Sequence, residues 1–304
     1  MADSSVPTPR SYSDRSVIRL DAATVLLQWS VGGLLFLWFT TRRREVGLGY
    51  GWLLRGTYLL MAAGALACGI AFGVVAVREV SSAAVVVAAL AVLVVSIVQR
   101  RAGVSGADAE HDRRSARVAE MTGIERDHRE GAREGREFDP RLDLIAPLLG
   151  VAGLVAGGVD AATGGAGNVV VSLLRTFAGA LFLGAVTDAM LLGHWYLVQP
   201  GLPRKHINEL VRALGVVWPV EVVAMLLPTG MLSVWSGSVD DGWNGTLGWF
   251  WAACAITTIV LVFVARAALK ERYYSAVMAT TGLLYLAILT AFGTDLVARA
   301  VLAG

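Results

Sequence analysis

Residues 169–200 read VVVSLLRTFAGALFLGAVTDAMLLGHWYLVQP, an apolar run interrupted by few polar side chains. Arg175 lies near its start, Asp188 past its middle, and the sequence His-Trp-Tyr at 194–196 close to its end. About 20 predominantly apolar residues are enough for a helix to cross a bilayer. Charged groups are costly in hydrocarbon and are retained there mainly for function. The run therefore predicts a membrane-spanning helix that carries part of a functional site.

The composition of the whole chain indicates that this helix is one of several. Hydrophobic residues make up 56% of the 304 residues, and the mean hydropathy is +0.61. Soluble domains contain about 45–50% apolar residues, and their charges are spread more evenly along the chain. We therefore expect an all-α polytopic integral membrane protein in a lipid bilayer. The net charge of +2 gives no indication of nucleic-acid binding.

Apolar runs of sufficient length predict eight transmembrane helices. They cover residues 22–40, 53–77, 82–98, 142–159, 169–198, 210–235, 247–268 and 274–302. These spans divide the chain into a polar N-terminal tail at 1–21, a first membrane segment of three helices at 22–98, a charged linker at 99–141, and a second membrane segment of five helices at 142–304.

Basic residues are concentrated on one side of this arrangement. Of the 26 Lys and Arg residues, 18 fall in loops on the side of the linker and five on the opposite side, while the remaining three lie at helix ends. Because cytoplasmic loops are enriched in Lys and Arg, we expect a cytoplasmic linker and both termini outside. Lys205 and Lys270 are the only lysines, and this arginine-rich composition favours a bacterial plasma membrane.

The two sides of the linker share a weak internal similarity. An offset of 157 residues aligns Trp38 with Trp195 and Arg55 with Arg212. Both compared segments leave a helix on the cytoplasmic side, pass a basic turn and begin the next helix. This predicts a parallel duplication of four plus four helices, as in transporters built from parallel repeats. Asp188 has an apolar counterpart, so we expect the chemistry in the second half.

The linker at 99–141 contains ten Arg and ten Asp or Glu residues. It has few apolar side chains and therefore cannot bury a core of its own. This composition predicts a flexible cytoplasmic connection between the halves. The alternative is a docking segment for a membrane or cytoplasmic protein partner.

Two acidic residues lie deep inside consecutive antiparallel spans. Asp188 lies eleven residues before Gln199, and Glu221 lies thirteen residues after Asn208. At about 1.5 Å per residue, both sit roughly 15–20 Å from the cytoplasmic boundary. Burial and mutual repulsion would make two adjacent carboxylates share a proton, so we expect a proton-holding pair. In the alternative, each acid is neutral and hydrogen-bonded separately, for example to Thr187.

Prolines and charges surround this pair. Pro219 and Pro228 flank Glu221 and predict helix kinks that free backbone carbonyls, as in the broken helices that line cavities of transporters. Arg175 is expected at the outer mouth, where it attracts an anion or extends to the membrane surface. Asp295 and Arg299 form an i,i+4 pair that is expected to stabilise the last helix.

His194 is the only histidine inside a predicted span. It lies on the same helix face as Thr187, while Trp195 lies on the face of Asp188. His194 is expected to connect the acids to the cytoplasm or to bind a quinone carbonyl. In the alternative, His194 and Trp195 belong to an aromatic belt that anchors the helix end at the membrane interface.

The residues that could bind a cofactor or metal are few. A haem b held by two histidines needs a second intramembrane histidine, and ligation by methionine is left to Met190, Met225 or Met278. Cys68 and Cys254 both lie in apolar runs, which disfavours a thiolate metal site. We therefore predict neither a cofactor nor a metal.

Together these features favour a protein that moves or relays protons, or a small solute, along a polar path in its second half. The path would comprise Asp188, Glu221, His194, Thr187 and Trp195. The alternative is a noncatalytic membrane subunit or scaffold of a larger complex, such as a respiratory, quinone-linked one. The third interpretation is an integral-membrane enzyme. It ranks below the other two because the sequence has no Walker loop, dinucleotide-binding glycine motif, zinc-protease helix or nucleophile elbow.

Overall fold

The computed structural model describes residues 20–106, 135–162 and 166–302, and all regular structure in these ranges is helical. The elements in chain order are α1 (Ala22–Thr41), α2 (Leu48–Phe72), α3 (Ala76–Val98), η1 (Gln99–Ala102), η2 (Pro140–Leu144), α5 (Ile145–Asp160), α6 (Ala166–Trp195), α7 (Lys205–Leu226), α8 (Leu232–Trp235), α9 (Thr246–Ala268) and α10 (Tyr274–Leu302). Most of the predicted tail and of the predicted linker, at 1–19 and 107–134, lies outside the described residues. Partner docking on the linker therefore stays a prediction.

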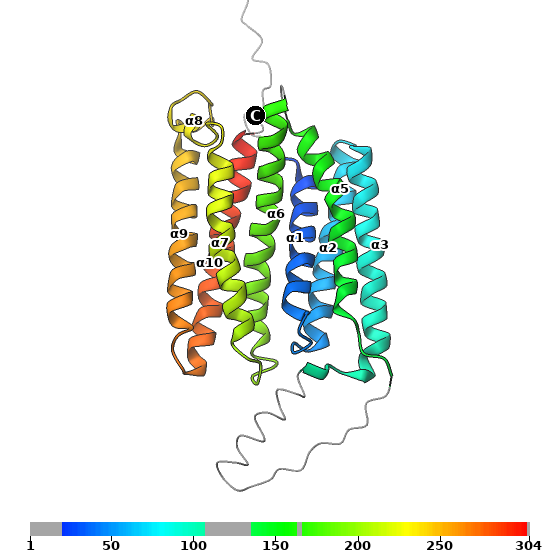
Figure 1. The fold of residues 1–304 in the computed structure, drawn as a ribbon. Helices are drawn as coiled ribbons and strands as arrows, with labels where there is room; N and C mark the ends of the chain where they lie inside the picture. Colours follow the sequence, from blue (N-terminus) through cyan, green and yellow to red (C-terminus); the bar gives the residue numbers. More distant parts are fainter. Residues whose placement is uncertain (1–19, 107–134, 163–165, 303–304) are drawn as a thin grey trace, which may run out of the picture.

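The long helices run alternately up and down, so their connections lie at two ends of the bundle (Figure 1). We call the end where α1 begins and α10 ends the terminal end, and the end that carries η1 and η2 the linker end. Leu20, Asp21 and Leu302 line one cavity at the terminal end. The first and last described residues therefore lie at the same end of the bundle.

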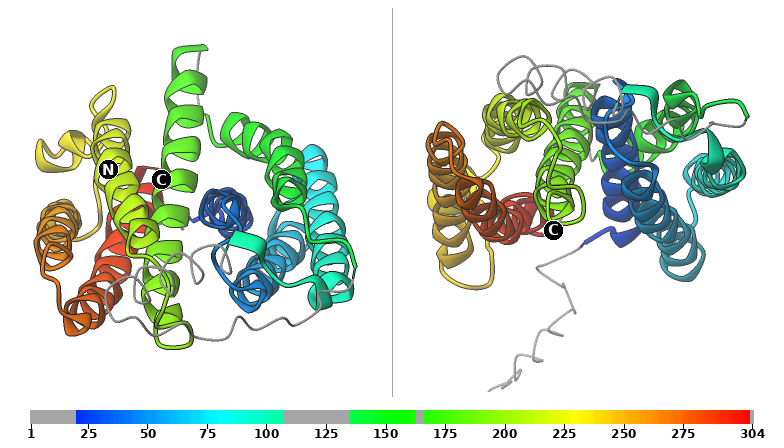
Figure 2. Two further views of the ribbon diagram at one scale, coloured as in Figure 1. Left: turned by 60° about the horizontal axis from the view of Figure 1, so that its bottom comes forward. Right: turned by 90° about the horizontal axis from the view of Figure 1, so that it is seen from below.

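The long helices form two groups of four. In the first half, α1 packs on α2, α2 on α3, α3 on α5 and α5 on α1. In the second half, α6, α7, α9 and α10 close a ring in the same order. The first helices of the two halves, α1 and α6, lie side by side in the middle and join the halves, as Figure 2 shows.

The backbones of α1 and α6 approach each other very closely. A Cβ atom on Gly32 would lie 1.7 Å from the carbonyl oxygen of Ala180, and one on Gly184 would lie 2.3 Å from the carbonyl carbon of Gly32. Helices in membranes pack this closely only where small residues meet, since no side chain then separates the backbones. These small residues therefore fix the contact between the two halves.

The surface of the bundle is apolar and its interior is partly polar. Leu60, Phe72 and Leu289 are 70%, 85% and 67% exposed, whereas Gln28 and Thr294 are fully buried. A soluble protein does not expose this much contiguous apolar surface, because water would drive such surfaces together. Seven of the described helices are long and apolar enough to cross a membrane. The chain therefore has the features of a helical membrane protein.

The long helix that is not among these seven is α7, which corresponds to the sixth predicted span at 210–235. It has 22 residues and includes Glu209, Arg212 and Glu221, and these charges reduce its apolar character. Pro219 lies inside it. The predicted kink at Pro228 is wrong, because α7 already ends at Leu226 and Pro228 belongs to the turn before α8.

The boundary between the second and third predicted spans is also wrong. The apolar sequence continues to Val77, but α2 ends at Phe72 and α3 begins at Ala76, so Arg78 lies in the first turn of α3 and not in a loop. Its guanidinium is 2% exposed and pairs with Glu79 at 2.8 Å and with Asp21 at 2.6 Å. A charged residue can lie in the end of a spanning helix when it is paired with an opposite charge. A span defined by apolar residues alone stops before such a residue.

The contact between α1 and α6 can be tested with a single methyl group. Gly32→Ala forces the two backbones apart, so we expect it to lower the free energy of unfolding by about 1–3 kcal/mol. Gly56→Ala is the matched control, because a Cβ atom on Gly56 meets nothing within 4 Å. The measurement is thermal unfolding of the purified protein in detergent. Equal stabilities of the two variants would contradict the close packing.

Candidate functional site

A buried pair of carboxyl groups lies in the second half. Glu221 of α7 and Asp295 of α10 are both fully buried, and their carboxyl groups are within hydrogen-bonding reach of each other. Among the described residues, no N–H or O–H group donates to either carboxyl oxygen of Glu221. Two ionised carboxylates repel each other strongly at low dielectric constant. The contact is therefore attractive only when the pair holds a proton.

The surroundings of Asp295 identify the member of the pair that is ionised. Asp295 accepts hydrogen bonds from Gln28 Nε2 at 2.9 Å and from Arg299 Nε at 2.8 Å. Donors of this kind stabilise a carboxylate, and Glu221 has none of them. The proton therefore belongs on Glu221. Because Gln28 lies on α1, the first half supplies one of the groups that hold this pair.

Two arginines connect the carboxyl pair to the terminal end. Arg299 Nη2 donates to the backbone carbonyl of Arg175 at 2.5 Å. Arg175 in turn donates to the carbonyls of Ala224 at 3.1 Å and Leu227 at 2.5 Å, at the end of α7. The carbonyl of Ala224 is the one that Pro228 was predicted to free. Arg175 therefore satisfies backbone carbonyls where α7 ends, and Arg299 connects Arg175 to Asp295.

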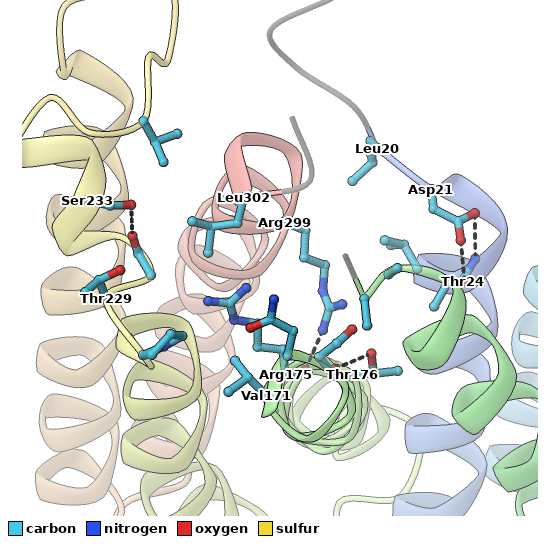
Figure 3. Close-up of a pocket in the computed structure, with 18 residues that line it drawn as sticks. Leu20, Asp21, Thr24, Val171, Arg175, Thr176, Thr229, Ser233, Arg299 and Leu302 are labelled. Atoms are coloured by element: carbon cyan, nitrogen blue, oxygen red, sulfur yellow. Dashed lines mark hydrogen bonds between the residues drawn. The ribbon is translucent and has the colours of Figure 1, made fainter. Parts of the chain in front are cut away.

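Both arginines line a cavity of about 430 Å³ at the terminal end. Figure 3 shows their side chains between Asp21 of the first half on one side and the turn with Thr229 and Ser233 on the other. The cavity thus lies between the two halves. Arg175 lines this cavity, and its role at the outer mouth of a path stays a prediction.

Asp188 and Glu221, which were expected to face each other, are not brought together. α6 ends at Trp195, so Asp188 lies about 10 Å from the end of its helix, at 1.5 Å per residue. α7 begins at Lys205, so Glu221 lies about 24 Å from the start of its helix. The depth estimate failed because the helices begin and end three to four residues away from the boundaries assumed.

Asp188 has partners from the first half instead. It is fully buried and accepts a hydrogen bond from the hydroxyl group of Tyr58, while the Tyr50 hydroxyl group donates to its backbone carbonyl at 3.3 Å. The neighbouring Thr187 accepts a hydrogen bond from Trp29 Nε1 at 2.8 Å. Both residues therefore contribute to the contact between the halves, on the linker side of the carboxyl pair.

His194 and Trp195 lie apart from the buried acids. The side chain of His194 is exposed on the outside of the bundle and packs edge-on against the Tyr285 ring, with 6.4 Å between ring centroids. Trp195 Nε1 donates to Gln199 at 3.1 Å, and its ring contacts Gly49. This position fits the interfacial aromatic belt and does not join His194 to Asp188.

Ion pairs connect the halves at the linker end. Glu209 of α7 accepts from Arg42 at 3.2 Å and from Arg43 at 2.6 Å, both in the loop after α1. Lys205 donates to Glu45 at 2.6 Å. We call these five residues the linker-end latch. The halves are thus held together at the linker end and enclose a cavity at the terminal end.

Glu45 is ionised in this latch at neutral pH. Burial by itself would raise its pKa, but hydrogen bonds from Lys205 and His206 outweigh that effect, so the pKa of Glu45 lies below its usual value. Its carboxylate is within 2.8 Å of both partners. Glu45 therefore contributes a negative charge to the latch at neutral pH.

No protein-family model, curated protein or solved structure matches this chain. The function therefore has to be inferred from the geometry of the site. In the described part of the chain, no group of three or more His, Cys, Asp and Glu side chains could hold a metal ion.

The structure also places buried charges that the sequence did not single out. Arg55 is 2% exposed and forms a two-pronged ion pair with Asp143 at 2.7 and 2.8 Å. It lies 4.6 Å from the centre of the Phe138 ring. Arg55 was assigned to a helix end, and Asp143 falls at the start of the fourth predicted span, at 142–159. The sequence did contain a signal for this pair, because Arg55 and Asp143 lie in two apolar runs, near the end of each run that faces the linker.

The importance of Arg299 for the carboxyl pair can be tested by removing the cation partner of Asp295 first and the Asp295 charge second. Arg299→Gln leaves a buried carboxylate with Gln28 as its remaining partner, so we expect a loss of about 3–5 kcal/mol in unfolding free energy. Adding Asp295→Asn should recover most of that loss, measured by unfolding in detergent. Arg43→Gln, at an exposed pair, should cost less than about 1 kcal/mol. A double variant as unstable as Arg299→Gln alone would contradict the pairing.

Proposed function

We propose that this protein moves protons together with a small solute across a bacterial plasma membrane. The observation that carries the proposal is Glu221, a fully buried acid that has no hydrogen-bond donor among the described residues and lies beside Asp295. An acid inside a membrane is costly and is retained mainly where protons or ions pass. Glu221 is the proton carrier in this proposal, and Asp295 is its ionised neighbour.

The proposed topology has eight crossings: the seven helices that are apolar enough to cross a membrane, and α7 in addition. In support of this, α7 lies alongside α6 and α9 over its 22 residues and connects the linker end to the terminal end (Figure 1). The carboxyl group of Glu221 faces the interior, where it costs less than in lipid. Both termini then lie outside, because 18 of the 26 basic residues lie on the side of the linker end.

The proposed duplication has support from the order of packing. Each half is a ring of four helices in chain order, and the first helices of the two rings meet in the middle. α2 begins at Leu48 and α7 at Lys205, which gives the same offset of 157 residues that aligns Arg55 with Arg212. The offset is lost at α9, which begins 170 residues after α3. We therefore propose that the halves arose from one four-helix unit and diverged most at the terminal end.

Two halves with a site between them suit transport by alternating access. The cavity lies between the halves at the terminal end, and the linker-end latch joins them at the opposite end. This arrangement supports an outward-facing state, in which the cavity is reached from outside while Glu221 stays buried. Breaking the latch and closing the cavity would carry the proton to the cytoplasmic side.

The proposal is tested in proteoliposomes that contain a pH-sensitive dye. Under an inside-negative potential, and with succinate, choline or glucose outside, the wild-type protein should let protons enter faster than empty liposomes with at least one of these solutes. Glu221→Gln should abolish that entry, because an amide cannot release a proton. The introduced amide can still donate to Asp295, so the variant should fold.

The control for this experiment is Asp240→Asn, which makes the same change of acid to amide at an exposed loop position. Its proton entry should equal that of the wild type. Proton entry at the rate of empty liposomes with all three solutes, or entry that survives Glu221→Gln, would overturn the proposal.

A further inference from the structure

The cavity at the terminal end combines two cationic side chains with apolar walls. Its volume of about 430 Å³ is within the range of small-molecule sites. Val25, Val171 and Leu302 supply apolar surface, and Arg175 and Arg299 supply charge. A site of this composition suits a small organic anion, whose charged group needs cations and whose body needs apolar contacts.

The two guanidinium groups have donors left for such an anion. In the part of the chain that the structure describes, each uses Nε and Nη2 for its contacts with the protein. A guanidinium carries five N–H bonds in total, so Nη1 of Arg175 and of Arg299 can still donate to a ligand. Like charges this close repel each other, and an anion between them would relieve the repulsion.

The acidic groups around the cavity leave Arg175 without a carboxylate partner among the described residues. Asp21 lines the opposite wall, but its carboxylate is paired with Arg78 at 2.6 Å. Asp295 neutralises one of the two arginines through its 2.8 Å contact with Arg299. Glu221 holds a proton and adds no charge. The carboxylates at the cavity are therefore engaged by Arg78 and Arg299, and neither of them engages Arg175.

We infer that the cavity binds a small organic carboxylate between Arg175 and Arg299, and that its binding is coupled to proton uptake by Asp295 and Glu221. The inference names the solute class for the proposed proton carrier and rests on that proposal. A carboxylate matches the planar guanidinium through two parallel N–H···O contacts. The apolar walls favour an organic body over a bare inorganic anion.

The coupling follows from the shared use of Arg299. The polar groups that face the carboxyl pair are Gln28 from α1, Arg175 from α6 and Arg299 from α10. A carboxylate that binds Arg299 offsets the positive charge beside the carboxyl pair, so the pair takes up a second proton more readily. Coupling of this kind is reciprocal, and protonation of the pair therefore strengthens binding of the anion. The anion and the proton thus bind together.

The test is calorimetric titration of the purified full-length protein in detergent with pentanoate, in buffers of different ionisation enthalpy. We expect pentanoate to bind more tightly as the pH falls and to bring one proton with it. Pentanamide has the same shape without the charge and should not bind. Pentanamide binding equal to pentanoate binding, or a preference for inorganic phosphate over pentanoate, would overturn the assignment to a carboxylate.

Two variants separate binding from coupling. Arg175→Gln should weaken pentanoate binding by about tenfold to a hundredfold, whereas the exposed Arg212→Gln should leave it unchanged. Asp295→Asn frees Arg299, so it should bind pentanoate more tightly than the wild type and without proton uptake. Wild-type binding without proton uptake would overturn the coupling.

The proteoliposome experiment distinguishes this inference from the proposed function. Proton entry with choline or glucose, but not with succinate, would retain Glu221 as the carrier and overturn the carboxylate as the solute. Carboxylate binding without any proton entry would retain the carboxylate site and overturn Glu221 as the proton carrier.

Discussion

The contact between the carboxyl groups of Glu221 and Asp295 is the interaction on which the rest of the site depends. It requires a proton, because two carboxylates cannot approach each other in a buried site when both are ionised. Asp295 is held by Gln28 from the first half and by Arg299 from the second. A movement of one half against the other would therefore change the charge that Glu221 experiences. The geometry thus links proton binding to the relative position of the halves.

The same physical problem, charge in a low-dielectric interior, is solved in a similar way elsewhere in the bundle. Arg55 pairs with Asp143, and Arg78 pairs with Glu79 and Asp21, so each buried guanidinium has a carboxylate within hydrogen-bonding distance. These pairs are complete. Glu221 differs from them because no cation among the described residues is bonded to it, and for this reason we propose Glu221 as the proton carrier. The close packing at Gly32 then keeps the halves near enough for Gln28 to reach across.

Much of the fold could be predicted from the sequence, because apolar runs of spanning length are a strong signal. The same runs revealed Asp188 and Glu221 as costly buried acids. Their pairing could not be predicted, since a shift of a few residues in helix boundaries moved the two acids to different depths. Asp295 was interpreted as a local partner of Arg299, because only the packing of α10 against α6 and α7 brings it near Glu221. The outward direction of His194 likewise depends on neighbouring helices that periodicity does not identify.

The most direct test of the central claim, that Glu221 holds a proton beside an ionised Asp295, is infrared spectroscopy of the purified protein at neutral pH. The wild-type spectrum should contain the carbonyl stretching band of a protonated carboxylic acid that disappears in Glu221→Gln. The band should persist in Asp188→Asn, which removes another buried acid that has an oxygen without a hydrogen-bond partner among the described residues. If Glu221→Gln instead removes only bands of an ionised carboxylate, Glu221 carries a charge and does not hold the proton.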